Sequence, residues 1–353
     1  MSAQPSTLRF LIIIPAYQED AVILATARAA LAQLYPQELY TVTIVSDHQQ
    51  AATDSMLSDL PLTLQRPQFE NSSKARALQY AVHHTAGQYD YVVVLDADNI
   101  ISPDFLSQLS EVCMQGYTAI QCHRTAKNSS GQVAMLDSLS EEINNTIFRR
   151  GHNRVGLSAA LIGSGMCFSH DWFKQHTDRL QTAGEDRELE KMLLTEGVHI
   201  HYAENIHVMD EKVANSSSFQ QQRLRWMSAQ LQSLLALLPG YPSAMLRCNI
   251  DYIDKTLQQA LIPRSILLVL LPALSVIVTL FSPHASIKWW CLTAVFCMSL
   301  LVALPKPLRN VRAFASLVKL PSLVALLISN LFRLDRRNRN FLHTRHERVK
   351  NEE

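Results

Sequence analysis

Residues 92–99 read VVVLDADN, and this stretch predicts both a fold and a ligand site. Its apolar residues indicate a buried strand that ends in Asp96-Ala97-Asp98. In an extended chain the side chains of residues i and i+2 share one face, so Asp96 and Asp98 project together. Two adjacent carboxylates repel unless a cation lies beside them, and Mg²⁺ or Mn²⁺ prefers oxygen ligands. The alternative is a solvated acidic turn, because an Asp-x-Asp pair alone is common.

Further short apolar runs alternate with helical patterns over the first 120 residues or so. Buried strands are expected at residues 10–14, 40–45, 91–95 and 119–123, and helices at 21–34, 74–83 and 136–148. This alternation predicts an α/β fold with a mostly parallel sheet. In such sheets ligands bind at the carboxyl ends of the strands, which is where Asp96 and Asp98 lie.

Two long apolar stretches follow in the C-terminal third. Residues 260–281 and 287–304 are each long enough to cross a hydrocarbon core, and SPHAS is expected to be the turn between them. The alternative is a hairpin buried in a protein core. A third stretch, 313–332, is interrupted by Lys319 and Pro321 and is expected to be an interfacial helix.

The composition agrees with a membrane-associated chain. Of the 353 residues 18% are charged, below the roughly 25% that is usual for soluble domains. Residues 305–353 contain 11 Lys and Arg against 4 Asp and Glu, so a basic tail follows an acidic remainder. Such a tail suits an anionic membrane surface, and the net charge of +1 gives no support to nucleic-acid binding. Six scattered cysteines and the lack of a signal-peptide pattern favour a cytoplasmic N-terminal domain.

Two further motifs carry chemical groups. Gly184-Glu185-Asp186 opens a helical pattern, where a carboxylate is either a routine N-terminal acid or a general base. In QQRLRW, residues 221–226, helical spacing places Gln222, Arg225 and Trp226 on one face. An amide, a guanidinium and an indole suit a sugar phosphate, although a membrane-proximal amphipathic helix is the alternative. Glu141-Glu142 and Arg149-Arg150 are expected to form a charged helix face, although the segment leads into the GSGM loop and could approach the acceptor.

The ordered set of motifs is more specific than any one of them. IIIPAYQED, Asp47, Lys74 in NSSKARALQYA, DAD, GSGM, GED and QQRLRW follow one another. Together they resemble the membrane-bound inverting glycosyltransferases of family 2, which include cellulose, hyaluronan, chitin and poly-N-acetylglucosamine synthases. The resemblance covers about residues 8–230 and the C-terminal FLHTRH, in which Thr344 matches a family position.

This resemblance implies a GT-A fold and a role for each matching residue. Asp186 matches the catalytic base, with Glu185 beside it, and Asp98 matches the metal-binding carboxylate for Mg²⁺ or Mn²⁺. The residues implied to bind the nucleotide-sugar are Pro15, Ala16, Tyr17, Glu19, Asp47, Lys74 and Asp96. Those implied to line the diphosphate and acceptor end are Gln222, Arg225, Trp226, Gly163, Ser164 and Gly165.

The resulting expectation is an enzyme that moves a hexose or N-acetylhexosamine from a UDP-sugar to a glycan or lipid-linked acceptor, forming a β-glycosidic bond for cell-surface polysaccharide. Addition of one sugar to a ceramide-like or polyprenyl-linked lipid is an alternative, as are a nucleotidyltransferase and a non-catalytic membrane scaffold. Two membrane helices make a poor polysaccharide channel, so export requires a homo-oligomer or a partner. The expected domains are a cytoplasmic GT-A domain (1–230), an interfacial connection (231–259), a transmembrane hairpin in the plasma or inner membrane (260–304) and a basic tail (305–353).

Overall fold

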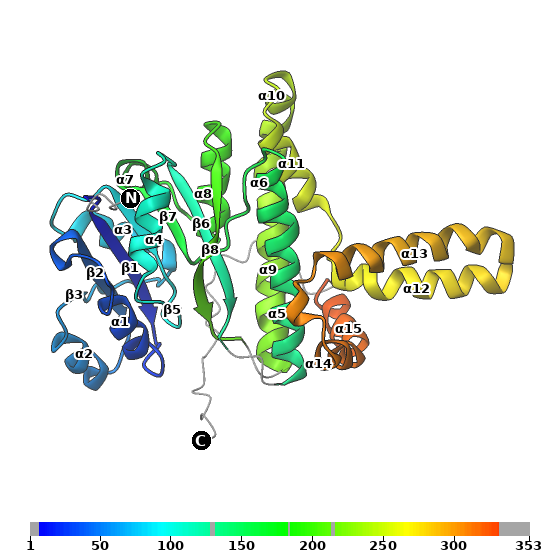
Figure 1. The fold of residues 1–353 in the computed structure, drawn as a ribbon, viewed down its shortest axis with the longest axis horizontal. Helices are drawn as coiled ribbons and strands as arrows, with labels where there is room; N and C mark the ends of the chain where they lie inside the picture. The colour runs from blue at the N-terminus through cyan, green and yellow to red at the C-terminus, as the bar shows by residue number, and fades with distance from the viewer. Residues whose placement is uncertain (1–6, 128–130, 183, 213–215, 332–353) are drawn as a thin grey trace, which may run out of the picture.

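The computed structural model describes residues 7–127, 131–182, 184–212 and 216–331 (Figure 1). Within these residues eight strands form one sheet, in the order β3-β2-β1-β4-β7-β6-β8-β5. The strands are β1 (Phe10–Tyr17), β2 (Tyr40–Asp47), β3 (Thr63–Gln65), β4 (Tyr91–Val94), β5 (Ile100–Ile101), β6 (Ala119–Ala126), β7 (Met166–Ser169) and β8 (Ile200–Asp210). The sheet is mixed, because β7 and β5 run antiparallel to their neighbours while the other strands share one direction. The expected α/β fold is confirmed.

Both faces of the sheet are covered, which explains why the first strand is a continuous apolar run. Phe10, Ile12 and Ile14 point into one core, whereas Leu11 and Ile13 point into the other. Strands buried on both faces do not alternate between apolar and polar residues. The helices of this part are α1 (Ile23–Leu31), α2 (Ala51–Ser58), α3 (Lys74–His84), α4 (Phe105–Cys113), α7 (His170–Thr177) and α8 (Glu185–Thr195).

The shared direction of β1, β2, β4, β6 and β8 brings their carboxyl ends to one edge of the sheet. The register of β6 against β8 shifts between Cys122 and His123, so that Cys122 pairs with Ala203 and His123 with His207. Such irregularities bend a strand and re-aim its side chains. The strand segments that follow the shift carry Arg124 and Asp210 to the same edge as Asp96.

A layer of helices lies between the sheet and the two long apolar helices near the C-terminal end of the described chain. In Figure 1, α5 (Gln132–Asn144) and the long α9 (Ser216–Leu237) stand side by side at the centre of the molecule. A π-helix, Asn145–Gly151, continues α5 and leads into α6 (His152–Arg154). After α9 the chain forms α10 (Tyr241–Leu246) and α11 (Ile250–Ala260), and α11 packs against α9.

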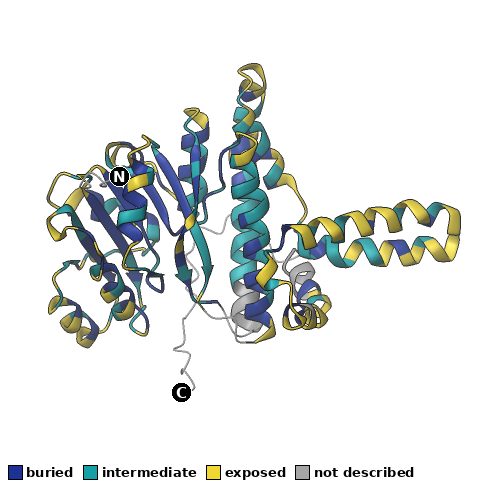
Figure 2. Ribbon diagram, viewed as in Figure 1, coloured by how far each residue is buried: buried dark blue, intermediate teal, exposed yellow. Residues whose placement is uncertain are grey.

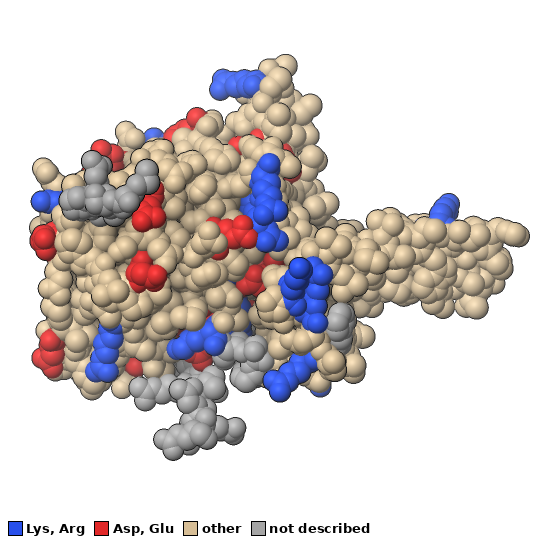
Figure 3. Space-filling model, in the orientation of Figure 1, with Lys and Arg blue, Asp and Glu red and all other residues tan. Residues whose placement is uncertain are grey.

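The two apolar stretches form a helical hairpin that projects from the rest of the molecule. The helices are α12 (Arg264–Phe281) and α13 (Pro283–Ala303), and both are long and apolar enough to cross a membrane, with only 11% of each apolar window buried. Figure 2 shows the hairpin as largely exposed, which argues against a buried core hairpin. Lys288 is the only Lys or Arg in residues 265–303 of the sequence, whereas Figure 3 shows basic side chains gathered at the base of the hairpin.

The structure corrects two expectations in this region. The SPHAS turn is shorter than expected: Ser282 alone separates the helices, because Pro283 suits the first helical position and Ser282 Oγ accepts a hydrogen bond from the Ala285 N–H. The stretch 313–332 is not one helix. It is divided into α14 (Val311–Ser316), a 3₁₀ turn (Leu317–Lys319) and α15 (Leu320–Leu331), and α15 packs against α9 and α12. Thr344 and the arginine-rich tail lie outside the described residues.

Candidate active site

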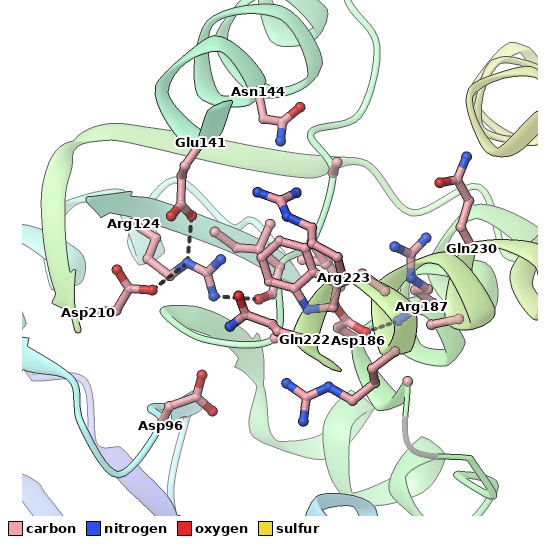
Figure 4. Close-up of a pocket in the computed structure, with 18 of the residues that line it drawn as sticks. Asp96, Arg124, Glu141, Asn144, Asp186, Arg187, Asp210, Gln222, Arg223 and Gln230 are labelled. Carbon is pink, nitrogen blue, oxygen red and sulfur yellow. Dashed lines mark hydrogen bonds and ion pairs between the residues drawn. The ribbon is translucent and has the colours of Figure 1, made fainter. Parts of the chain in front are cut away.

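A cavity of about 780 Å³ opens at the carboxyl edge of the sheet and extends to the base of the hairpin. It is lined by fourteen of the sixteen residues that the sequence singled out. The two that do not line it are Ser164 and Gly165. Further lining residues come from α5, the π-helix, α11, the hairpin and the ends of β6 and β8, and part of this lining is drawn in Figure 4.

The ends of β1 and β2 form the first wall. Tyr17 ends β1 and pairs in register with Asp47, which ends β2 and is almost fully buried. The residues that follow these strands, Gln18 and His48, both have positive φ angles (54° and 58°). Non-glycine residues seldom adopt this conformation, and they concentrate where a sharp turn serves a site. The Asp47 carboxylate lies 2.6 Å from His48 Nδ1, so the carboxylate is oriented within the wall.

The second wall is a group that we call the Lys74 cluster: Lys74, Asp96, Glu185 and the Gly163 carbonyl. Lys74 is the first residue of α3, whose N-cap Ser73 accepts a hydrogen bond from the Arg76 N–H. Lys74 Nζ lies 2.5 Å from Asp96 Oδ1, 2.5 Å from the Gly163 carbonyl oxygen and 3.2 Å from Glu185 Oε1. One ammonium therefore joins the strand-end loop, the GSGM loop and the start of α8.

Burial and the neighbouring charges together set the protonation states of Lys74 and Glu185. Burial raises the pKa of the Glu185 carboxyl to about 7, although the charge of Lys74 acts against it. Burial alone would lower the pKa of Lys74, but the carboxylates of Asp96 and Glu185 outweigh it and raise the Lys74 pKa above its usual range. Lys74 is thus a permanent cation, and Glu185 is a carboxyl that titrates near neutral pH.

The GSGM loop contributes its backbone. Gly163 has a φ of +83°, and a Cβ at this position would lie 3.7 Å from Asp186 Oδ2, Glu185 Oε1 and Lys74 Nζ. Glycine is therefore favoured by the backbone conformation, whereas a Cβ would make only ordinary contacts with these three charged groups. Ser164 is fully buried, and Gly165 donates its N–H to the Val94 carbonyl. Both lie beneath the cavity wall.

Asp98 lies at the floor of the cavity and is 8% exposed. Its Oδ1 accepts a hydrogen bond from Asn99 Nδ2 (3.1 Å) and its Oδ2 accepts one from the Glu211 N–H (3.1 Å). Asp210 lies close enough that the charge of Asp98 contributes to a raised pKa of Asp210, whose main cause is burial. The described residues contain no group of three or more His, Cys, Asp or Glu side chains arranged for a metal. The donor set suits Mg²⁺ or Mn²⁺ held by one or two carboxylates, with phosphate oxygens and water as the other ligands.

A second ionic group adjoins Asp98, and the sequence reasoning missed it. This Arg124 cluster consists of Arg124 on β6, Glu141 on α5, Asp210 at the end of β8, and Lys212. Arg124 Nε lies 2.6 Å from Glu141 Oε1 and 3.5 Å from Asp210 Oδ2, while Lys212 contacts both carboxylates. Burial acts to raise the pKa of Glu141, yet the charges of Arg124 and Lys212 hold it at about 2. Figure 4 shows Arg124 between the two carboxylates.

The expected charged helix face is not an exposed one, and Glu141 and Arg149 line the cavity instead. Glu141, Glu142 and Arg149 are all buried, with 7%, 6% and 3% of each residue exposed. They are buried because each finds a partner: Glu142 accepts from His123 and Thr125, and Arg149 donates to Asn145 Oδ1 and to the Ala160 carbonyl. The sequence does contain a pattern that could have identified Asp210. In HVMD, residues 207–210, an acidic residue follows apolar residues, as it does in LDAD at residues 95–98.

Helices α8 and α9 complete the cavity. Asp186, in the first turn of α8, is half-buried, and its Oδ1 accepts a hydrogen bond from the Arg187 N–H (2.8 Å). Gln222, Arg225 and Trp226 of α9 all line the cavity, as the helical spacing predicts. The Arg223 guanidinium stacks 4.6 Å from the centre of the Trp226 ring and forms an ion pair with Asp137 of α5. Stacking against Arg223, which Asp137 holds in place, fixes the indole of Trp226. The indole gives the cavity a flat apolar wall.

The arrangement therefore combines four chemical capabilities. It offers carboxylates for a divalent cation, guanidinium and ammonium groups for phosphate, a flat indole for a sugar ring, and a half-buried carboxylate that can accept a proton. All of them border one cavity at a sheet edge where nucleotides bind in open α/β folds.

Comparisons with known proteins agree with this picture. The chain is 24% identical over 310 residues to an N-acetylglucosaminyltransferase of Rhizobium meliloti (strain 1021), covering 82% of this chain and 70% of that protein. It is 22% identical over 314 residues to an N-acetylglucosaminyltransferase of Rhizobium leguminosarum bv. viciae, covering 82% and 69%. The fold is similar to that of the mannosyltransferase PcManGT from Pyrobaculum calidifontis, solved with GDP-Man and Mn²⁺, with a TM-score of 0.52, 18% identity and coverage of 94% and 90%.

The family model described as glycosyltransferase like family 2 matches residues 6–229, which is more than half of the chain. This match sets aside the nucleotidyltransferase and the non-catalytic scaffold as alternatives. The chain belongs to the family 2 glycosyltransferases and is a glycosyltransferase of GT-A fold.

Proposed function

We propose that the protein transfers a hexose or N-acetylhexosamine from a UDP-sugar to an acceptor hydroxyl with inversion, forming a β-glycosidic bond in cell-surface polysaccharide synthesis. The observation that carries this proposal is the meeting of the Lys74 cluster, Asp98, Asp186 and the Gln222–Trp226 segment around one cavity. The names of the two rhizobial relatives make UDP-N-acetylglucosamine the first donor to test.

The donor's nucleoside would lie against Pro15, Ala16, Tyr17, Glu19 and Asp47. Its diphosphate would extend past Asp96 towards Arg225. A divalent cation at Asp98 would neutralise charge on the departing diphosphate. Arg225 would stabilise the same charge by hydrogen bonding, and Trp226 would support the sugar or acceptor ring.

Asp186 would act as the general base. Its carboxylate accepts the proton of the attacking hydroxyl while the acceptor oxygen forms a bond to C1 and the C1–phosphate bond breaks, so that UDP leaves. Direct displacement inverts C1, which gives a β-linkage from an α-linked donor. Glu185, next to it and partly protonated near neutral pH, would limit the negative charge around the leaving phosphate.

We further assign residues 1–230 to a catalytic domain on the cytoplasmic side and residues 260–304 to two membrane spans. The exposure of the hairpin and the basic side chains at its base support this orientation, because basic segments favour the cytoplasmic side. Both ends of a two-span hairpin lie on one side of the bilayer. The arrangement therefore keeps the cavity at the cytoplasmic membrane surface.

The decisive experiment is Asp186→Asn in protein purified in lipid. Transfer should fall about 10²- to 10⁴-fold, while UDP still binds with its normal affinity. The matched control is Asp59→Asn, which changes an exposed aspartate on the body of the molecule and should leave the rate unchanged. A panel of UDP-N-acetylglucosamine, UDP-glucose and GDP-mannose, each with and without Mn²⁺, identifies the donor. Normal transfer by Asp186→Asn would refute the base assignment, and lack of activity with every UDP-sugar would refute the donor class.

A further inference from the structure

The cavity does not end at the sugar-binding side chains. It is also lined by Leu261, Ile262 and Pro263 of the connection between α11 and α12, by Leu267 of α12 and by Phe296 of α13. These residues are apolar, and the last two belong to the helices that are long enough to cross a membrane. A single cavity thus joins the catalytic carboxylate Asp186 to the start of the apolar hairpin.

Two guanidinium groups, those of Arg264 and Arg149, also line this cavity. Arg264, the first residue of α12, donates through Nη2 to Asn144 Oδ1 (2.5 Å) and to the Ser140 carbonyl (3.4 Å). Its Nη1 is buried and has no hydrogen-bond partner among the described residues. Arg149 also hydrogen-bonds neutral oxygens, those of Asn145 and Ala160. Buried guanidinium groups that hydrogen-bond neutral oxygens are well suited to receive a phosphate.

The same cavity is therefore lined by apolar, cationic and catalytic groups. These apolar residues do not suit a soluble oligosaccharide, because its hydroxyl groups would lose hydrogen bonds to water when they lie against apolar side chains. An amphiphile matches all three kinds of group: its hydrocarbon tail can contact the apolar residues, its phosphate the guanidinium groups and its hydroxyl Asp186. Phe148 of the π-helix packs against the Arg264 guanidinium, because its ring centre lies 5.7 Å from Arg264 Cζ.

We propose that the acceptor is a lipid with a phosphate-containing head group, which enters the cavity from the membrane past Leu267 and Phe296 and is held at Arg264. The proposal rests on the glycosyl transfer proposed above and specifies its acceptor. In the reaction the lipid's hydroxyl oxygen bonds to the donor sugar's C1, its proton passes to Asp186, and UDP departs with the electrons of the broken C1–O bond.

The test uses the full chain in phosphatidylcholine nanodiscs with the donor that the panel identifies. Four acceptors are compared: polyprenyl diphosphate-linked N-acetylglucosamine, the same head group on a butyl chain, a neutral long-chain alkyl N-acetylglucosaminide, and a free chitin tetrasaccharide. The long-chain diphosphate should have a kcat/KM at least about tenfold above that of each other acceptor. One charge-assisted hydrogen bond, or a few buried methylene groups, contributes enough free energy for such a ratio. Binding of each acceptor without donor is measured in parallel.

Two pairs of variants locate the contacts. Arg264→Gln should raise the KM for the diphosphate lipid about tenfold and leave the KM for the neutral lipid unchanged, whereas Arg264→Lys keeps a charge and should lie between. Leu267→Ser should reduce the preference for the long chain over the butyl chain. Leu280→Ser, the same change near the exposed tip of the same helix, should not alter that preference.

The outcomes separate this inference from the proposed function. Equal transfer to the free tetrasaccharide, or an unchanged KM in Arg264→Gln, would overturn the lipid acceptor while leaving glycosyl transfer intact. Lack of UDP-sugar binding and of UDP release would instead refute the proposed function itself, and the acceptor assignment with it.

Discussion

The two ionic clusters that flank Asp98 are built from the same groups but differ in exposure and balance. The Lys74 cluster has one cation for two carboxylates, and Asp96 remains 36% exposed to the cavity. The Arg124 cluster has two cations for two carboxylates, and its members are only 3–13% exposed. An accessible cluster can contact a ligand, whereas buried charges that pair with one another suit the fixing of neighbouring elements. We therefore propose that the first cluster serves catalysis directly and that the second serves it by holding the Asp98 region in place.

Stability should depend most strongly on the Arg124 cluster. Glu141→Gln leaves Arg124 and Lys212 buried beside a neutral amide, and the loss of one partner of a buried ion pair costs about 3–5 kcal/mol of unfolding free energy. Denaturant unfolding of the purified protein measures this loss. The exposed control Glu38→Gln should stay within about 0.5 kcal/mol of the wild type. Equal stability of the two variants would contradict a structural role for the cluster.

Activity should depend more strongly on the Lys74 cluster. Lys74→Met removes the ammonium that joins Asp96, Glu185 and the Gly163 carbonyl, so kcat/KM should fall about 100-fold, corresponding to roughly 2–3 kcal/mol. Initial rates at saturating metal and limiting donor measure the change. Lys174→Met alters an exposed lysine on α7 and should have no effect. If Lys74→Met lost stability but kept its kcat/KM, the two clusters would not differ in role.

The sequence predicted the first cluster and missed the second for a physical reason. Asp96 and Glu185 each lie in a local pattern, a strand end and a helix start, where the backbone alone places the side chain. Arg124, Glu141 and Lys212 lie in no such pattern. Glu141 pairs with residues 17 and 71 positions away, and these contacts exist only after β6, β8 and α5 have packed together.

The same distinction holds for the fold. Strands β1, β2, β4 and β6 and the apolar hairpin follow from local hydrophobic patterns, and their positions were predicted within a few residues, whereas the short β3 and β5 were not predicted. The antiparallel insertion of β7, the register shift in β8 and the π-helix after α5 depend on tertiary packing. Those features carry the unpredicted residues, because they bring Arg124, Asp210 and Arg149 to the cavity.

A pH-dependent difference should separate Glu185 from ordinary carboxyls. Burial raises its folded-state pKa from 4.5 to about 7, so the unfolded chain releases this proton first as the pH rises. Wild-type stability should therefore fall between about pH 4.5 and 7 through this group. The variant Glu185→Gln lacks this titrating carboxyl. Its free energy of unfolding relative to the wild type should therefore increase by about 1 kcal/mol or more from pH 5 to pH 8.

Denaturant unfolding at pH 5, 6, 7 and 8 provides the measurement for both proteins. Glu111→Gln, at an exposed position of α4, should show no such trend relative to the wild type. A constant difference between Glu185→Gln and the wild type would mean that Lys74 keeps Glu185 ionised throughout. The Lys74 cluster would then be as firmly paired as the Arg124 cluster, and the contrast between them would weaken.

The smallest expected effect is the coupling between the clusters. No residue belongs to both, and among the charges acting on Arg124 that of Asp96 contributes less than those of Glu141 and Asp210. The double variant Lys74→Met/Glu141→Gln should therefore lose the sum of the two single losses in unfolding free energy, within about 0.5 kcal/mol. All four proteins of the cycle are measured in one detergent at one ionic strength. A coupling energy of about 1 kcal/mol or more would show that the two clusters act as one network. Asp98, which lies between them, would then be positioned by both, and the division between a catalytic and a structural cluster would no longer hold.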